Sequence, residues 1–312
     1  MSKYIADKAV ERGVNICLNS SVNQLVIRNG KVTGVILANG KELSSKIVIS
    51  NIDMNNTYFK LLTETQRTQF LTPEMLSALK KIEYNSPVFK INLILNQLPR
   101  FNCLSNIIKA ASLTNIHNLS SETRYHNEIA RNYFPGTIHM NSESISDIDK
   151  AYLEALNGSP SSSPMIEMTI PSILDQTLTP KNSGHHVIGL FCQFAPYKLK
   201  NCETWDHNKK RSFADKVYSE IEKYAEGFTD TILFEDLLSP LDMEETFSLT
   251  GGNIFHGAMD INSISFCRPT TFNSRYHQPI ENLFSCGSAM HPGGGVMGAP
   301  GRNCALMIMK KI

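Results

Sequence analysis

The chain has 312 residues, of which 41% are hydrophobic and 19% are charged, and its formal net charge is +1. These values are typical of a soluble globular protein with a substantial buried core. A net charge so close to zero gives no electrostatic basis for binding nucleic acid or an anionic membrane surface. No apolar run approaches the ~18 residues of a membrane-spanning helix.

The N-terminal region predicts a helix followed by a strand. Residues 3–12 have the pattern of the end of an amphipathic helix, and Gly13 would stop it. Val14, Ile16 and Leu18 then alternate with small or polar residues, which predicts a half-buried strand. The first residues lack both an apolar signal core and the arginine-rich composition of a transit peptide.

Two Asn-Gly pairs predict hairpin turns in the next segment. Residues 29–30 and 39–40 each separate two apolar runs. Type I′ turns require positive φ at both central residues, and Asn-Gly satisfies this best. We therefore expect a three-stranded antiparallel meander made of residues 24–28, 31–37 and 42–49.

The region from residue 53 to about 275 mixes helical and strand patterns without an internal repeat. Helices are predicted at residues 73–81, 147–156 and 206–224. Strands are predicted at residues 88–95, 165–170 and 185–194, and a loop at 160–164. The pattern therefore predicts one mixed α+β unit that is inserted between two segments of another unit.

Near the C-terminus a glycine-rich turn joins an apolar run to a predicted helix. The run ends at Gly287, and the helix continues to residues 310–311. Glycine lets a ligand approach the backbone, and a helix start offers free N–H groups and the positive end of the helix dipole. This combination suits a phosphate or the O2/N1 edge of a reduced flavin. A purely structural turn fits the same residues.

Neither the cysteines nor the histidines predict a metal site. The seven cysteines have no CxxC spacing, and their odd number does not indicate a closed disulfide framework. Buried thiols in a reducing compartment are the simpler interpretation. His185 and His186 lack a third ligand at a suitable spacing, so we expect no zinc there.

Three segments together resemble the phytoene-dehydrogenase-like branch of the FAD-dependent oxidoreductases. They are residues 251–257, Arg268-Pro269 and residues 283–303, with support from 170–175 and 238–244. The resemblance covers nearly the whole chain. It implies an α/β plus α+β fold, in which a partial FAD-binding domain like that of glutathione reductase carries an inserted mixed-sheet substrate domain.

The resemblance also implies domain limits and cofactor contacts. Residues 1–52 and 276–312 would belong to the FAD domain, and residues 53–275 would form the substrate domain. FAD would be the cofactor. The implied contacts are Val22 at the adenine, Gly287 and Ser288 along the ribityl-pyrophosphate side, and Gly294, Gly295, Val296 and Met297 at the isoalloxazine.

Several side chains near these segments are candidates for chemistry. His291 could orient substrate or tune flavin protonation, or it could simply shape the turn through its backbone. Arg268 could place a positive charge near the flavin or a substrate carboxylate, or pair with an acid of the substrate domain. His256 could line the substrate cavity or be structural. Cys286 and Cys304 flank the turn, and buried thiols fit them better than a redox disulfide.

The chain departs from the family in one respect. Members of the family open with a strand, a GxGxxG turn and a helix, and no such motif occurs in this sequence. We therefore expect that the chain begins partway through the FAD domain. We also expect that the strand at 283–286 lacks its sheet neighbours, and that FAD binding is weak or lost.

Two hypotheses of function follow. The first is a flavoprotein oxidoreductase that removes a hydride from an apolar or amine-bearing small molecule, with no protein nucleophile. The second is a non-catalytic, truncated interaction protein that has lost the flavin. By resemblance the location would be mitochondrial, with a mitochondrial protein partner, and otherwise cytoplasmic.

Overall fold

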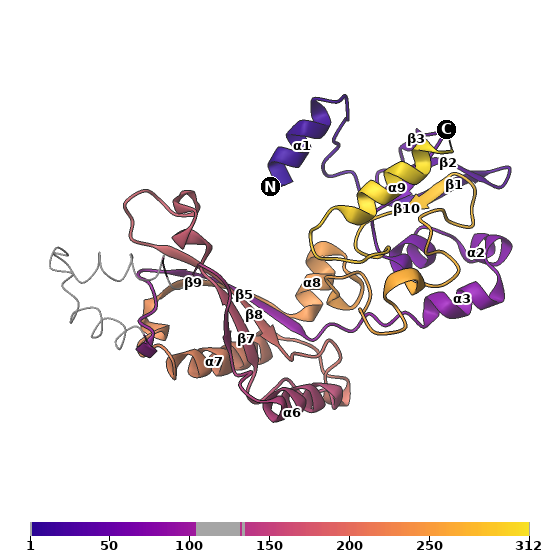
Figure 1. Cartoon of the computed structure of the whole chain (residues 1–312). Helices are drawn as coiled ribbons and strands as arrows, with labels where there is room; N and C mark the ends of the chain where they lie inside the picture. The colour runs from indigo at the N-terminus through magenta and orange to yellow at the C-terminus, as the bar shows by residue number, and fades with distance from the viewer. Residues whose placement is uncertain (1, 104–131, 133–134, 312) are drawn as a thin grey trace. The chain divides into compact units, whose positions relative to one another are not determined.

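The computed structural model describes residues 2–103, 132 and 135–311, and they divide into two compact units (Figure 1). The first unit joins residues 1–83 to 255–312, and the second comprises residues 84–254. The predicted limits after residues 52 and 275 both fall inside the first unit. The assignment of a FAD domain and a substrate domain to these parts remains a prediction.

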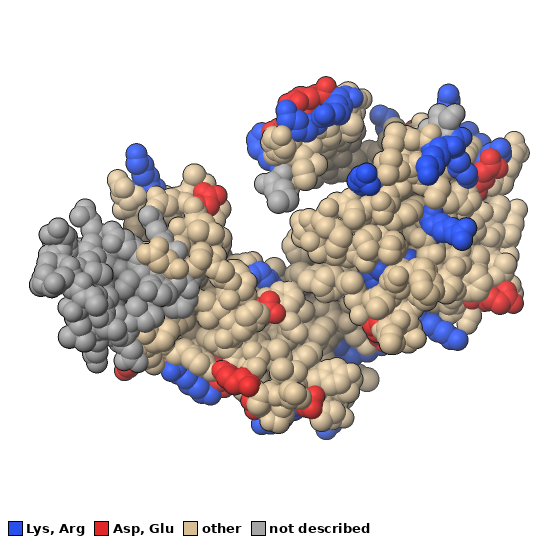
Figure 2. Space-filling model, viewed as in Figure 1, with Lys and Arg blue, Asp and Glu red and all other residues tan. Residues whose placement is uncertain are grey.

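At the N-terminus the predicted helix forms and the predicted strand does not. Helix α1 (Ser2–Val10) buries no residue, and basic and acidic side chains lie side by side on the surface of this N-terminal segment (Figure 2). Val14, Ile16 and Leu18 are 49%, 49% and 80% exposed and lie in irregular backbone. An alternating pattern needs a partner strand, and no described strand pairs with this segment.

The predicted hairpin follows. Strands β1 (Val22–Arg28) and β2 (Lys31–Leu37) pair antiparallel. Asn29 and Gly30 between them have φ of 50° and 77°, as a type I′ turn requires. The third strand of the meander, β3 (Glu42–Ser44), is shorter than predicted.

The rest of the predicted third strand belongs to a different sheet. Strand β4 (Val48–Ser50) pairs in parallel with β10 (Leu283–Ser285). The expectation that the strand at 283–286 would lack a neighbour is therefore wrong. Val32 also donates its N–H to the carbonyl of Glu281 at 2.9 Å, so the meander is tied to the C-terminal segment. These long-range pairings leave no mark in the local pattern.

Helices complete the core of the first unit. They are η1 (Asn56–Lys60), α2 (Glu64–Phe70), α3 (Pro73–Lys80) and α9 (Ala299–Met309). The predicted helices at 73–81 and after the glycine turn are thus confirmed. Thr72 starts α3 by accepting the N–H of Met75 at 3.3 Å. The shared core includes Tyr58, Leu79, Leu283, Phe284 and Ile308.

The second unit is built on a five-stranded antiparallel sheet with the order β6-β7-β8-β5-β9. Its strands are β5 (Val88–Leu95), β6 (Ile138–Met140), β7 (Met165–Thr169), β8 (His186–Gln193) and β9 (Ile232–Leu238). The predictions for β5, β7 and β8 are confirmed, whereas β6 and β9 were not predicted.

One face of this sheet packs against α7 (His207–Glu222), which lies along it in Figure 1. Asp206 caps α7 by accepting the N–H of Lys209 at 2.8 Å. Trp205 makes a core contact, with its ring 5.5 Å from that of Phe89 and 6.0 Å from that of Phe213. Helix α6 (Ile145–Leu156) begins two residues before its prediction because Ser144 caps it.

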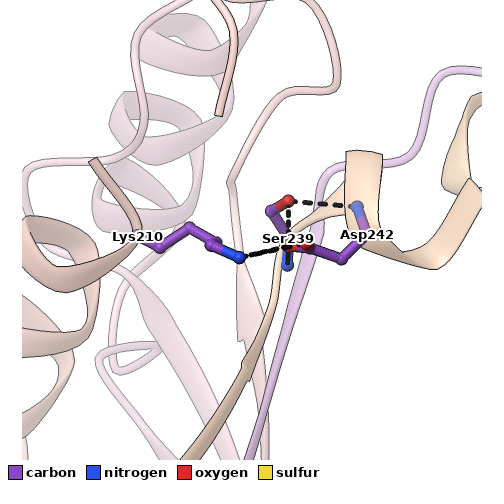
Figure 3. A network of polar contacts seen from close by, with 3 residues as sticks. All are labelled: Lys210, Ser239 and Asp242. Atoms are coloured by element: carbon purple, nitrogen blue, oxygen red, sulfur yellow. Dashed lines mark hydrogen bonds and ion pairs between the residues drawn. The ribbon is translucent and has the colours of Figure 1, made fainter. Parts of the chain in front are cut away.

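Helix α8 (Pro240–Phe247) accounts for the segment 238–244. Ser239 Oγ accepts the N–H of Asp242 at 3.2 Å, and the Asp242 carboxylate accepts the N–H of Ser239 at 2.8 Å. This reciprocal pair is a capping box. Lys210 of α7 forms an ion pair with Asp242 at 3.0 Å, so the cap also joins the two helices (Figure 3).

Short 3₁₀ helices make up the remaining regular structure. They are η2 (Pro171–Ile173), η3 (Gln176–Leu178), η4 (Lys200–Cys202), η5 (Thr229–Thr231), η6 (Thr250–Gly252) and η7 (Ser265–Cys267). In the described ranges no helix combines the length and the apolar character needed to cross a bilayer.

Candidate functional site

The glycine-rich turn between β10 and α9 adopts a backbone that other residues would strain. Gly287 has φ of 80°, and a Cβ atom placed on it would lie 2.0 Å from Asn51 Oδ1. Gly293 and Gly295 have φ of 111° and 116°, again in the region that favours glycine. Asn51 follows β4, so the parallel strand pair fixes the beginning of the turn.

Arg268 connects this turn to residues 255–263. The side chain is 2% exposed, and its Nε and Nη2 atoms donate to the carbonyl of Ser288 at 2.9 and 2.8 Å. The guanidinium also donates to four carbonyls of the other segment, those of Phe255, Gly257, Ala258 and Ser263. Five carbonyls from two distant segments are therefore held by one side chain, which makes Arg268 a positioning residue for Ser288.

His291 and α9 are linked through Tyr276. The Tyr276 hydroxyl donates to the carbonyl of His291 at 2.6 Å, and Asn303 of α9 donates to the same hydroxyl oxygen at 2.9 Å. The backbone of His291 thus takes part in shaping the turn. A catalytic role of its ring stays a prediction.

Three buried polar atoms of the first unit have no hydrogen-bond partner among the described residues. They are Nδ1 of His256, Oγ of Ser285 and Nδ1 of His291. Buried polar atoms in folded proteins are nearly always bonded, to water or a ligand if not to protein. Burial lowers the pKa of His256; Asp53 opposes this effect and Arg268 adds to it. His256 is therefore held as a neutral imidazole.

The end of the turn projects into solvent. Val296 and Met297 are 89% and 57% exposed, and Val296 has φ of 55°, which is unusual for a β-branched residue. Gly298 follows as the N-cap of α9 and provides no side-chain hydrogen bond. The first N–H groups of α9 are therefore left for another acceptor. Gly294 lies on the inner side, where a Cβ atom would come within 2.7 Å of Phe255 Cδ1.

The structure places the remaining predicted residues as follows. Val22 opens β1, is 38% exposed and lies opposite Leu37, and no hydrogen bond of the described residues joins it to the turn. Cys286 and Cys304 are free thiols. Burial raises the pKa of both, that of Cys304 to about 11. Neither is therefore a thiolate at neutral pH.

Two further motif segments serve the second unit. Gly251 and Gly252 have positive φ, and Cβ atoms there would lie 2.4 Å from the Tyr84 carbonyl oxygen and 2.2 Å from that of Pro240. The pair therefore permits close backbone packing. Ser172 accepts the N–H of Val187 at 3.0 Å and so fastens η2 to β8.

A surface cavity of about 590 Å³ lies beside Ser172, and His185 and His186 are among its lining residues. In the part of the chain that the structure describes, no three potential metal-ligating side chains gather at one point.

The chain is similar along its whole length to known proteins. It is 37% identical over 313 residues to the pyridine nucleotide-disulfide oxidoreductase domain-containing protein 2 of Rattus norvegicus, covering 100% of this chain and 50% of the relative. The family resemblance is confirmed. The chloroplastic prolycopene isomerase of Daucus carota is 25% identical over 299 residues, with 95% of this chain and 40% of the relative covered. No protein-family model matches the chain.

The fold is also shared with a solved structure. An oxidoreductase from Methanosarcina mazei superposes with a TM-score of 0.50 at 12% identity, over 93% of this chain and 48% of that one. The mixed α/β content of the predicted fold is thus confirmed. The chain spans about half the length of the relatives that it matches.

Several residues that hold the turn were not predicted. For Asn51 the sequence offered one indication, because the residue ends an apolar strand at a polar corner. Tyr276 and Asn303 act through contacts with residues far along the chain. No local pattern marks such contacts, so sequence reasoning had no means of finding them.

Proposed function

We propose that the chain is part of a flavin-dependent oxidoreductase that removes a hydride from an apolar or amine-bearing small molecule. The observation that carries this proposal is the similarity along the whole chain, at 37% identity, to an oxidoreductase domain-containing protein. FAD would be held by Gly287, Ser288 and residues 294–297, with Val22 toward the adenine.

The residues present fit such a cofactor. The exposed loop at Val296 and Met297 leads into the uncapped start of α9. A helix start of this kind stabilises a nearby negative charge by about 0.3–2 kcal/mol. Bound FAD would supply hydride acceptance. The chain's own residues would bind and orient it, and Arg268 would keep the Ser288 backbone in place.

The name of one relative supports the apolar substrate class. The Daucus carota relative is named for prolycopene, which is an apolar hydrocarbon. The family resemblance further supports an amine-bearing substrate as the alternative. On the same basis we propose a mitochondrial location and a mitochondrial protein partner.

FAD titration of the purified chain tests the proposal. Because the GxGxxG segment is absent, we expect weak binding, seen as a change in flavin absorbance that saturates as FAD is added. The variant Val296→Asp should bind FAD at least about tenfold more weakly, because its carboxylate would repel the electron-rich edge of the flavin. Leu18→Asp is the matched control, since Leu18 is 80% exposed and lies outside the turn. Equal binding by both variants would contradict the site.

A second candidate function is a flavin-free interaction protein. Its support is the exposed apolar loop in which Ile261 is 84% and Phe266 is 74% exposed. Apolar side chains that gather on a surface mark interaction sites. This candidate predicts a protein that stays colourless after incubation with FAD.

A further inference from the structure

The two faces of the second unit's sheet differ in their surroundings. One face contributes Phe89, Ile91 and Leu190 to the core that α7 covers. On the other face, Lys90 of β5 lies opposite Phe191 of β8; Val88 at the start of β5 is buried there, but no residue of that face belongs to the core cluster that α7 covers.

Lys90 lies in a slot made by the absence of a side chain at residue 189. A Cβ atom on Gly189 would lie 2.7 Å from Lys90 Nζ and 3.2 Å from Thr169 Oγ1. The lysine therefore crosses from β5 over β8 toward β7. This direction takes its ammonium away from Asp236 on β9, which already accepts a hydrogen bond from Asn92 at 3.2 Å.

The charge of Lys90 has no partner in the described part of the chain. Its side chain is half-buried, and neither a hydrogen bond nor an ion pair reaches its ammonium. Burial lowers the pKa of Lys90, and only Cys192 opposes this effect. Other half-buried cations are paired, as Lys210 is with Asp242 (Figure 3) and Arg211 is with Glu235. A desolvated ammonium without an anion is unfavourable.

The surroundings of the ammonium indicate what could compensate it. Apolar side chains share the face: Phe191 is half-buried, and Ile94 and Phe234 are 37% and 58% exposed. Glu167 and Asp236 on the same face disfavour a multiply charged anion. A single carboxylate on a hydrocarbon body matches both the charge and the apolar neighbours.

We propose that this sheet face binds apolar molecules that carry one carboxylate, with Lys90 Nζ as the ion-pairing group and Gly189 as the residue that gives it room. The proposal concerns the second unit alone and does not depend on flavin. It adds a binding site in a part of the chain to which the proposed FAD contacts do not extend.

Octanoate and octan-1-ol, titrated calorimetrically into the FAD-free full chain, test the proposal. We expect wild type to bind octanoate, and Lys90→Met to bind it at least about tenfold more weakly, which is the loss of one charge-assisted contact. Octan-1-ol should bind both equally. The control Lys216→Met removes an exposed lysine of α7 and should change nothing.

A second variant covers the case in which Lys90→Met does not fold. Gly189→Ala keeps the charge but displaces the flexible ammonium, and octanoate binding should fall while octan-1-ol binding persists. The proposal is overturned if wild type does not bind octanoate, or if Lys90→Met binds it as well as wild type. Neither result bears on FAD binding, which the Val296 variant tests separately.

Discussion

The two units are stabilised in different ways. In the second unit a regular sheet packs one alternating face against α7, and neighbouring strands repeat the same contacts along their length. In the first unit the turn before α9 depends on single long-range contacts, above all those of Arg268 and Tyr276. Repeated packing contacts tolerate the loss of one contact better than a turn that two side chains hold.

This difference bears on function. A binding site built from loops needs contacts from other segments to fix its backbone. Buried hydrogen bonds can provide such contacts, but some of the buried polar groups are then left without a partner. The unpartnered atoms of His256, Ser285 and His291 all belong to the first unit. The buried polar atoms without a partner among the described residues therefore lie in the unit that contains the proposed FAD contacts.

Of the substitutions considered, removal of the Arg268 side chain should reduce the unfolding free energy most. Arg268→Met removes a donor from five carbonyls, of which that of Ala258 keeps a second one, the Ser263 hydroxyl, so the first unit should lose about 3 kcal/mol or more of unfolding free energy. Hydrogen exchange would locate the loss, since amides of the second unit should stay protected. The control Arg302→Met, at an exposed position, should change stability by less than about 0.5 kcal/mol. Uniform loss of protection in both units would refute the comparison.

Removing a helix cap in the second unit should reduce the unfolding free energy by less than the loss of Arg268 does. Ser239→Ala abolishes the capping box of α8 and should cost about 1 kcal/mol in urea unfolding. Ser219→Ala, at an exposed position of α7, should be neutral or slightly stabilising. A cost for Ser239→Ala as large as that for Arg268→Met would mean that the second unit also depends on single contacts.

The smallest expected effect is on the pH dependence of stability through His256. Because burial lowers the pKa of His256 below 6.5, the unfolded state takes up this proton more readily, and stability falls as pH drops below 6.5. His256→Asn removes the titration and keeps a residue that accepts the observed φ of 60°. Wild type should therefore lose more stability than the variant between about pH 8 and pH 5. Parallel pH profiles would show that His256 does not contribute.

Local patterns predicted much of the second unit. Strands β5, β7 and β8 and helix α7 have clear apolar periodicity, and Asp206 signals the start of α7. Strand β9 was missed because its outward face includes Phe234 and Leu238, so it lacks a clean alternation of apolar and polar residues. The strand predicted from the alternation of Val14, Ile16 and Leu18 was wrong, because alternation does not guarantee a partner strand.

For the proposed site, the sequence by itself determined the glycines, which suit the positive φ at residues 287, 293 and 295, and its motifs carried the resemblance to the FAD-dependent oxidoreductases. The tertiary structure alone decided that β4 pairs with β10, that Arg268 holds Ser288, and that Lys90 lies over Gly189. The physical reason is range. Turn conformation depends on adjacent residues, whereas these contacts join residues that only the folded chain brings together.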